Sequence, residues 1–267
     1  MTYLFDPDNW EWLWTGNNFR FLIEGFLVNL QIAAIAIVFS LIFGLMLALL
    51  RISNRRLISF PAGIWVDVWR NLPLIFIILY LALAVPDAWR QAYSDAIPDF
   101  FPEALQDELV LGALLGLVLY NSAVLCEIMR SGILSLDRGQ REAAASLGLT
   151  YFQQMRFVVL PQGLRRMVPA TVSQLITLNK DTTLVSIIAI QEVVRHGSSV
   201  TGAGFFGGVQ APILQVFIVI GLMFVVVNLA LSRLSRRLEI RERRRTGTTM
   251  KPVEGLEDQV ALQTDTT

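Results

Sequence analysis

Side chains able to act as nucleophiles, metal ligands or redox centres are scarce in this sequence. It contains one cysteine, Cys126, and one histidine, His196. A disulfide needs two cysteines, and a structural zinc site needs about four Cys or His ligands. No GxxxxGK[ST] phosphate-binding loop occurs anywhere, and such a loop is what cradles a nucleotide in most ATPases. We therefore predict no catalytic residue, no metal site and no cofactor bound by this chain.

Two charged residues inside an apolar stretch form the next chemical candidate. Lys180 and Asp181 separate the apolar pieces 167–179 and 182–191. A charge at the bilayer centre costs roughly 2.5–3.5 kcal/mol on insertion scales, so it must face protein or water. The two residues either form a mutual ion pair that holds a broken helix or mark a gate on a substrate pathway. Asp181 is also placed to cap a helix that starts at Thr182.

Asn121 and Ser122 lie near the middle of another apolar run, residues 109–126. Hydrogen bonding to a neighbouring helix is the simpler interpretation, because buried amides and hydroxyls commonly hold membrane helices together. Contact with a transported substrate is the alternative. The candidate residues for a substrate pathway or gate are therefore Asn121, Ser122, Lys180, Asp181 and Thr182.

Further charged residues occur in pairs at helical spacing. Glu127 and Arg130 are three residues apart, as are Asp67 and Arg70. Residues at i and i+3 are neighbours on a helix, so an ion pair within each helix is the simplest interpretation. Contact with the segment that follows is the sharper hypothesis for Glu127 and Arg130. His196 is predicted to be a surface-loop residue on the outer side.

Five apolar segments must position these residues. A bilayer core needs about 20 helical residues. Three segments contain no charge, and a fourth, 57–85, joins an apolar stripe to an uncharged run. With 54% hydrophobic and 16% charged residues and no net charge, nothing predicts binding to nucleic acid. We predict an all-α integral membrane protein with five transmembrane helices, within residues 25–50, 57–85, 109–126, 167–191 (broken at 180–181) and 211–231.

The distribution of charge predicts one orientation in the cell membrane. Arginines follow the first, third and fifth segments, and cytoplasmic loops are the ones enriched in Lys and Arg. The loop 86–108 carries six acidic residues against Arg90 alone, and the N-terminus is also acidic. The N-terminus is therefore predicted to lie outside, with Trp10, Trp12 and Trp14 at the membrane interface, and the C-terminus in the cytoplasm.

The cytoplasmic segment 137–161 has the strongest local signals. Asp137 and Gln140 resemble a helix start, and a second start follows at Thr150 and Gln153. Between them lies a run of small helix-forming residues, and Gly148 permits a left-handed turn. Two capped helices with small residues on one face predict close docking of a partner protein. An amphipathic element resting on lipid is the alternative.

The same segment resembles a known motif. Glu142-Ala143-Ala144, Gly148 and Leu160-Pro161 are similar to the EAA motif of binding-protein-dependent ABC importer permeases, with Val158 where that family has Ile. Other stretches resemble the polar amino-acid permeases of this family, and the Tyr-Asn-Ser stretch is most similar to the glutamate-type members. These stretches are Arg70-Asn71-Leu72-Pro73, Tyr120-Asn121-Ser122 and Lys180-Asp181-Thr182-Thr183-Leu184.

The resemblance implies a type I ABC importer permease, with segment 137–161 as the coupling helix region. It implies a second permease chain, identical or not, an ABC ATPase dimer that binds ATP-Mg, and an extracytoplasmic amino-acid-binding protein. It also implies that Glu142, Ala143, Ala144, Gly148, Leu160 and Pro161 couple ATPase closure to alternating access. The implied substrate is a polar amino acid, glutamate or a related one.

Three other functions remain as alternatives. A secondary amino-acid transporter or channel would need coupling residues deep in several spans, and the sequence shows one charged pair and no internal repeat. A membrane enzyme lacks clustered reactive residues, and a structural scaffold leaves the capped segment unexplained. The predicted organisation is an interfacial N-terminus (1–20), a transmembrane permease domain (21–240) and a basic, then disordered, cytoplasmic tail (241–267).

Overall fold

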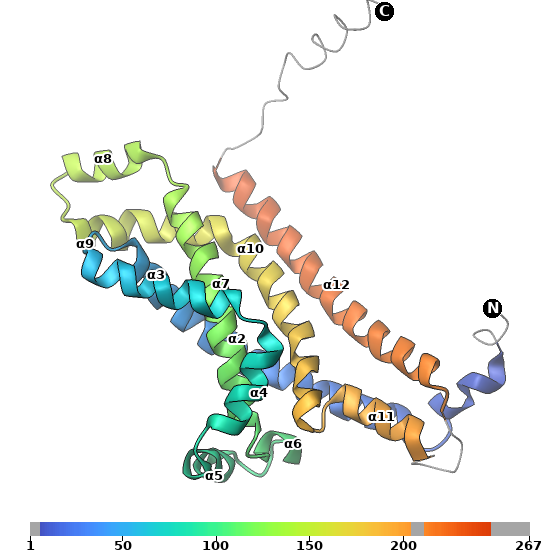
Figure 1. Ribbon diagram of the computed structural model, residues 1–267. Coiled ribbons are helices and arrows are strands. Elements are labelled where there is room, and N and C mark those ends of the chain that lie inside the picture. Colours follow the sequence, from blue (N-terminus) through green and yellow to red (C-terminus); the bar gives the residue numbers. More distant parts are fainter. Residues whose placement is uncertain (1–5, 204–210, 247–267) are drawn as a thin grey trace, which may run out of the picture.

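The computed structural model describes residues 6–203 and 211–246. These residues form helices and connecting turns, with no strand among them, which confirms the predicted all-α class (Figure 1). The segment 137–161 falls within the described residues, whereas residues 1–5, 204–210 and 247–267 lie outside them. In chain order the elements are η1 (Pro7–Leu13), α2 (Asn18–Ile52), α3 (Arg56–Asn71), α4 (Leu74–Ala84), α5 (Asp87–Ala96), α6 (Glu103–Gln106), α7 (Val110–Leu134), α8 (Arg138–Ser146), α9 (Tyr151–Gln154), the π-helical turn η2 (Met155–Val159), α10 (Leu160–Asp181), η3 (Thr182–Ile188), α11 (Val193–Ala203) and α12 (Ile213–Thr246).

Three helices are long and apolar enough to cross a membrane, namely Asn18–Ile52, Val110–Leu134 and Ile213–Arg237. They contain the first, third and fifth predicted segments. The bent pair α3–α4 makes a fourth if it counts as one span. By length and composition the described residues thus contain three or four spans, and the predicted count of five is not established.

The predicted second span is not one helix. Helices α3 and α4 meet at an angle of 103°, because Leu72 and Pro73 interrupt the helical hydrogen bonding. Leu72 has φ −89° and ψ 137°, the extended conformation that a following proline imposes on its neighbour. Helix α3 therefore runs across the bundle while α4 packs along α7 (Figure 1).

Helix α7 lies at the centre of the bundle and packs against α2, α4 and α10. Glycines let the backbones approach closely. A Cβ at Gly112 would lie 2.5 Å from Ala82 Cα, and one at Gly116 would lie 3.2 Å from Ile78 Cα, both on α4. Gly112 and Gly116 form the GxxxG spacing that favours tight helix pairs in membranes.

The fourth segment is more continuous at its start than predicted. Helix α9 runs through η2 into α10 without leaving right-handed helical conformation at Met155 or Leu160. The helix therefore continues through Pro161. A proline ring crowds the carbonyl four residues earlier, and the wider π-helical turn directly before it accommodates that ring.

The α-helix ends at Asp181, at the break predicted for residues 180–181. The chain tightens into the 3-10 helix η3 and then reverses at Ala189, which has a left-handed φ of 65°. Helix α11 follows and packs against α2 and α12. Asp181 makes no side-chain capping bond to η3, so the predicted cap is wrong.

The N-terminal segment also differs from the prediction. Trp12 is buried in a cluster with Leu22, Phe26 and Val216, whereas Trp14 is exposed. Trp12 is therefore a core residue of the protein and not an interfacial anchor, because η1 folds back onto the start of α2.

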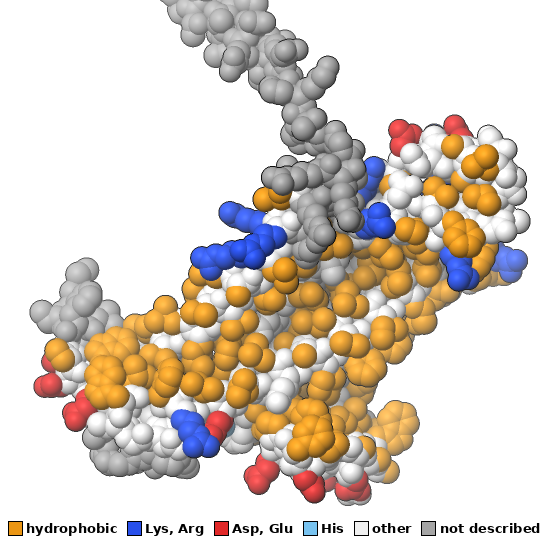
Figure 2. Space-filling model, turned by 180° about the vertical axis from the view of Figure 1, so that it is seen from behind, with side chains coloured by type: hydrophobic (Ala, Val, Ile, Leu, Met, Phe, Trp, Pro, Cys, Tyr) orange, Lys and Arg blue, Asp and Glu red, His pale blue; other side chains and the backbone are white. Residues whose placement is uncertain are grey.

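An apolar band separates two charged ends of the molecule. In Figure 2 most visible Lys and Arg side chains gather along one edge and most Asp and Glu side chains along the other, with hydrophobic side chains between them. Figure 1 places α8 at one end of the bundle and α5, α6 and α11 at the other.

Candidate functional site

The segment 137–161 forms a hairpin-like device that projects from the bundle (Figure 1); we call it the α8 device. The Asp137 carboxylate accepts a hydrogen bond from Gly139 N at 2.8 Å and caps α8. Gly148 has a φ of 77°, which only glycine adopts without strain. Thr150 and Gln153 form a reciprocal capping box at the start of α9. All three local predictions are confirmed.

Hydrogen bonds fasten the α8 device to the bundle. Gln162 Nε2 on α10 donates to Gln140 Oε1 at 3.2 Å, and Arg141 Nη2 donates to Ile133 O on α7 at 3.4 Å. Ala144 is the one residue of α8 buried against the protein. These hydrogen bonds join α8 to α10 and α7.

The remaining residues of the motif face outward. Glu142, Ala143, Gly148 and Pro161 are exposed, while Leu160 is partly buried and packs against the cluster around Met167. Leu147 is 80% exposed and Phe152 is 69% exposed. Apolar side chains this open at the tip of a charged end favour a protein contact.

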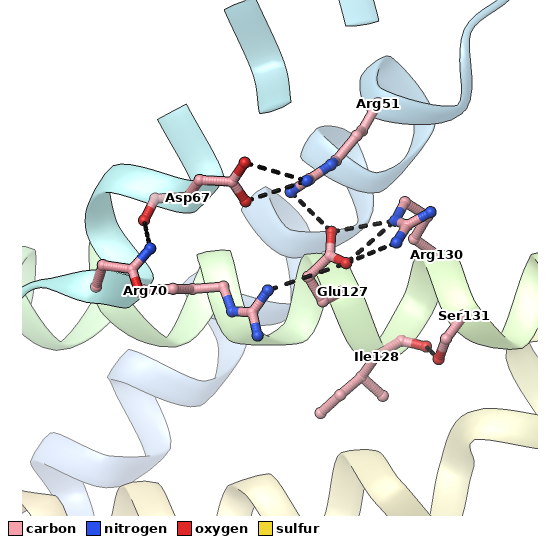
Figure 3. Close-up of polar contacts among 8 residues, drawn as sticks. Arg51, Asp67, Arg70, Glu127, Ile128, Arg130 and Ser131 are labelled. Carbon is pink, nitrogen blue, oxygen red and sulfur yellow. Dashed lines mark hydrogen bonds and ion pairs between the residues drawn. The ribbon is translucent and has the colours of Figure 1, made fainter. Parts of the chain in front are cut away.

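A second polar group joins three helices at the arginine-rich end (Figure 3). The Glu127 carboxylate on α7 lies 2.8 Å from Arg51 Nη1 on α2, 2.9 Å from Arg130 Nη2 and 4.0 Å from Arg70 Nη1 on α3. Arg51 also pairs with Asp67 at 3.0 Å. We call these five residues the Glu127 cluster. The i,i+3 pair is confirmed for Glu127 and Arg130.

The i,i+3 prediction is wrong for Asp67 and Arg70, because α3 presents each of them to a different helix. The sharper hypothesis for Glu127 and Arg130 is not borne out either. Among the described residues, their ion-pair partners lie on α2, α3 and α7, and none lies on the α8 device.

The polar residues of the third span make hydrogen bonds within the protein. Asn121 Oδ1 accepts from Gln174 Nε2 on α10 at 2.8 Å, and its amide donates to Leu117 O. Ser122 donates to Leu119 O at 3.0 Å. Both residues are buried. Asn121 makes the predicted hydrogen bond to a neighbouring helix, whereas the bond of Ser122 stays within α7.

Lys180 and Asp181 do not pair with one another within the part of the chain that the structure describes. No ion pair joins them, so the proposed mutual bridge is wrong. Lys180 is exposed, on the same face of α10 as the exposed residues Ser173 and Thr177. This face presents hydroxyls and a charge where a lipid-facing helix would present apolar side chains.

Thr182 belongs to a buried network that sequence reasoning missed. Asn29 Nδ2 donates to Thr182 Oγ1 at 3.1 Å and to Glu192 Oε2 at 3.0 Å. Asn29 Oδ1 accepts from Val193 N at 3.1 Å, and Glu192 Oε1 accepts from Arg195 N. The network fixes η3 and the start of α11 against α2. The amides Asn29 and Gln31 in the otherwise mostly apolar run 25–50 were the available signal.

His196 was also placed wrongly by sequence. It lies in α11, buried, with its ring stacked on Phe21 at 3.9 Å between centroids. His196 Nδ1 lies 2.7 Å from Phe21 O. His196 packs α11 against α2. The imidazole fits there because Gly25 on α2 has no side chain; a Cβ at Gly25 would lie 2.7 Å from His196 Nδ1.

Comparison with known proteins places this geometry in a family. The family described as "Binding-protein-dependent transport system inner membrane component" matches residues 40–244. The probable glutamine ABC transporter permease protein GlnP of Bacillus subtilis is 40% identical over 83% of this chain and 94% of its own length. The glutamate/aspartate import permease protein GltK of Escherichia coli O6:H1 is 31% identical over 83% of this chain and 93% of its own.

Solved structures agree with the sequence relatives. A chain from the crystal structure of an amino acid ABC transporter with histidines superposes with a TM-score of 0.67 at 27% identity, covering 84% of this chain and 94% of that one. A chain of the inward-facing MetNI methionine ABC transporter gives 0.62 at 18% identity, which supports the fold alone. The protein therefore belongs to the binding-protein-dependent transport system inner membrane component family, and is a permease of the ABC importer type.

Proposed function

We propose that this chain is the translocating subunit of an ATP-driven importer for a polar amino acid. Its relatives are named for glutamine, for glutamate and aspartate, and for arginine, so glutamate or a related amino acid is the proposed substrate. A second permease chain, an ABC ATPase dimer that binds ATP-Mg, and an extracytoplasmic amino-acid-binding protein complete the assembly.

The α8 device is the observation that carries the proposal. It is rigidly anchored, capped at both helix starts, and exposed along Glu142, Ala143 and Gly148. A helix held by bonds to α7 and α10 moves those helices when a partner moves it. ATPase closure, acting on this device, is proposed to switch the permease between inward-facing and outward-facing states.

The orientation follows from the charge distribution. The arginine-rich end carries the α8 device and the C-terminal part of α12, and the acidic end carries α5 and α6 (Figure 2). The positive-inside rule then places the device in the cytoplasm and the N-terminus outside. Both ATPase contact and delivery by an external binding protein need this arrangement.

The exposed face of α10 is the proposed wall of the pathway. Ser173, Thr177 and Lys180 face outward from the single chain, and a polar row at membrane depth must face water or another protein. A second permease chain opposite this face would enclose it. Asn121 then holds α10 against α7 from behind this face, and Thr182 holds η3 against α2.

Substitution of Gly148 in the intact transporter tests the proposal. No atom lies within 4 Å of a Cβ built at Gly148, so a side chain there meets nothing in this chain. Gly148→Asp and Gly148→Asn both add a small side chain that tolerates a left-handed turn. Gly148→Asp places a charge in the docking surface and is expected to abolish ATP-dependent uptake, whereas Gly148→Asn retains part of it.

Uptake of labelled glutamate, glutamine, arginine and histidine is measured in cells that express the permease with its cognate ATPase and binding protein. Membrane levels of both variants serve as the control. Normal uptake by Gly148→Asp at normal membrane levels contradicts the coupling role. The labelled amino acid that the unmodified transporter takes up most strongly identifies the substrate.

A further inference from the structure

An open cavity lies between α2, α3 and α7 at the arginine-rich end of the molecule. Its volume is about 1010 Å³, and the residues that matter in its lining are Arg51, Arg56, Phe60, Ile64, Asp67 and Arg130. Its lining includes Arg51, Asp67 and Arg130 of the Glu127 cluster, which Figure 3 shows.

The charges around the cavity do not balance. Arg51, Arg56, Arg70 and Arg130 stand against two carboxylates, Asp67 and Glu127, which leaves a net charge of +2 from four positive and two negative groups. Within the described ranges 6–203 and 211–246, Arg56 makes no ion pair. Its guanidinium offers a planar fork of donors, which suits a phosphate group.

The outer wall of the cavity is apolar. Leu57 is 93% exposed, and Phe60 and Ile64 are also exposed on the same side of α3. Because α3 turns by 103° from α4, this apolar side lies along the membrane surface when α4 lies in the bilayer. Side chains of this kind next to arginines match a ligand that is anionic at one end and hydrocarbon at the other.

We propose that this cavity binds the phosphate headgroup of an anionic phospholipid. Arg56 and Arg130 contact the phosphate, and an acyl chain lies along Phe60 and Ile64. The lipid would join α3 to the ends of α2 and α7, next to the helices that carry the α8 device. The inference uses the proposed membrane placement but not the coupling role.

Arg56→Gln tests the site, with Arg55→Gln as the matched control. The two residues are adjacent and both exposed, so they contribute equally to general attraction toward a negative surface. Arg56 lines the cavity, whereas Arg55 does not. Neither makes an ion pair within the described chain, so neither substitution breaks the Glu127 cluster.

Binding of dioctanoyl phosphatidylglycerol to the purified full-length transporter is followed in detergent by native mass spectrometry. Dioctanoyl phosphatidylcholine and inorganic phosphate are the comparison ligands. An arginine near an anionic surface contributes about a fivefold change in binding. We expect Arg56→Gln to weaken phosphatidylglycerol binding by roughly fivefold and Arg55→Gln to leave it nearly unchanged. Phe60→Ser is expected to weaken the lipid but not inorganic phosphate.

Three outcomes overturn the proposal. Equal losses in the Arg55 and Arg56 variants mean general surface attraction. Equal binding of phosphatidylcholine means that charge plays no part, and displacement of the lipid by inorganic phosphate at similar concentration means that the site takes a free anion. Loss of transport in Gly148→Asp with normal lipid binding separates this site from the coupling role.

Discussion

Glu127→Gln tests the ion-pair cluster that joins α2, α3 and α7. The substitution keeps the size of the side chain and removes its charge. The Glu127 carboxylate lies 2.8 Å from Arg51 Nη1, 2.9 Å from Arg130 Nη2 and 4.0 Å from Arg70 Nη1. Its side chain is 18% exposed. Breaking a buried pair costs about 3–5 kcal/mol, and an exposed pair is worth about 0–1 kcal/mol.

The Glu127 cluster lies between these limits, because it is mostly buried and Arg51 keeps Asp67 as a partner. We expect Glu127→Gln to lower the free energy of unfolding by about 1.5–3 kcal/mol. For a chain of this size that corresponds to a fall in Tm of about 3–12 °C. Thermal unfolding of the purified protein in detergent measures it.

Glu24→Gln is the matched control. Glu24 pairs with Arg20 at 2.9 Å on one helix, with its side chain 51% exposed, and such a pair contributes about 0.3–0.5 kcal/mol. Its loss is expected to move Tm by less than about 2 °C. Equal shifts for the two variants would refute the reasoning that burial and multiple partners make Glu127 important.

Three further predictions concern packing, the buried network and the pathway. Gly112→Ala is expected to cost about 1–3 kcal/mol of stability, because its Cβ would meet α4 backbone at 2.5 Å, whereas Gly221→Ala meets nothing within 4 Å and is expected to leave Tm unchanged or slightly raised. Asn29→Leu is expected to cost about 2–4 kcal/mol by thermal unfolding, since a buried carboxylate and a backbone N–H lose their partner; an unchanged Tm would contradict the network. Thr177→Cys in the intact transporter is expected to react with a water-soluble thiol reagent, while Val226→Cys on α12 is expected not to; the reverse pattern would place lipid at α10.

Local signals in the sequence predicted the α8 device well. A cap at Asp137, a left-handed turn at Gly148 and a capping box at Thr150 each depend on residues within four positions. The long apolar runs likewise predicted α2, α7 and α12, since hydrophobic length alone decides whether a helix can span a bilayer.

Predictions that needed distant partners failed, and so did two local ones, the pairing of Lys180 with Asp181 and the helix cap at Asp181. The ion-pair partners of Asp67 lie on α2, and Asn29 meets Glu192 across more than half of the chain. The burial of Trp12 and His196 depends on how η1 and α11 fold back onto α2. The bend between α3 and α4 did have a local signal, Pro73 itself, which disfavours helix at Leu72. The apolar stripe of α3 favoured one continuous span in its place.

Crosslinking of the α8 device to the ATPase tests the central claim most directly. Ala143→Cys places an exposed thiol on α8, and Cys126 is buried. In inside-out vesicles that contain the complete transporter, a short thiol-to-amine crosslinker is expected to join this residue to the ATPase subunit. A product with Ser94→Cys on α5 instead, or none with Ala143→Cys, would contradict the account.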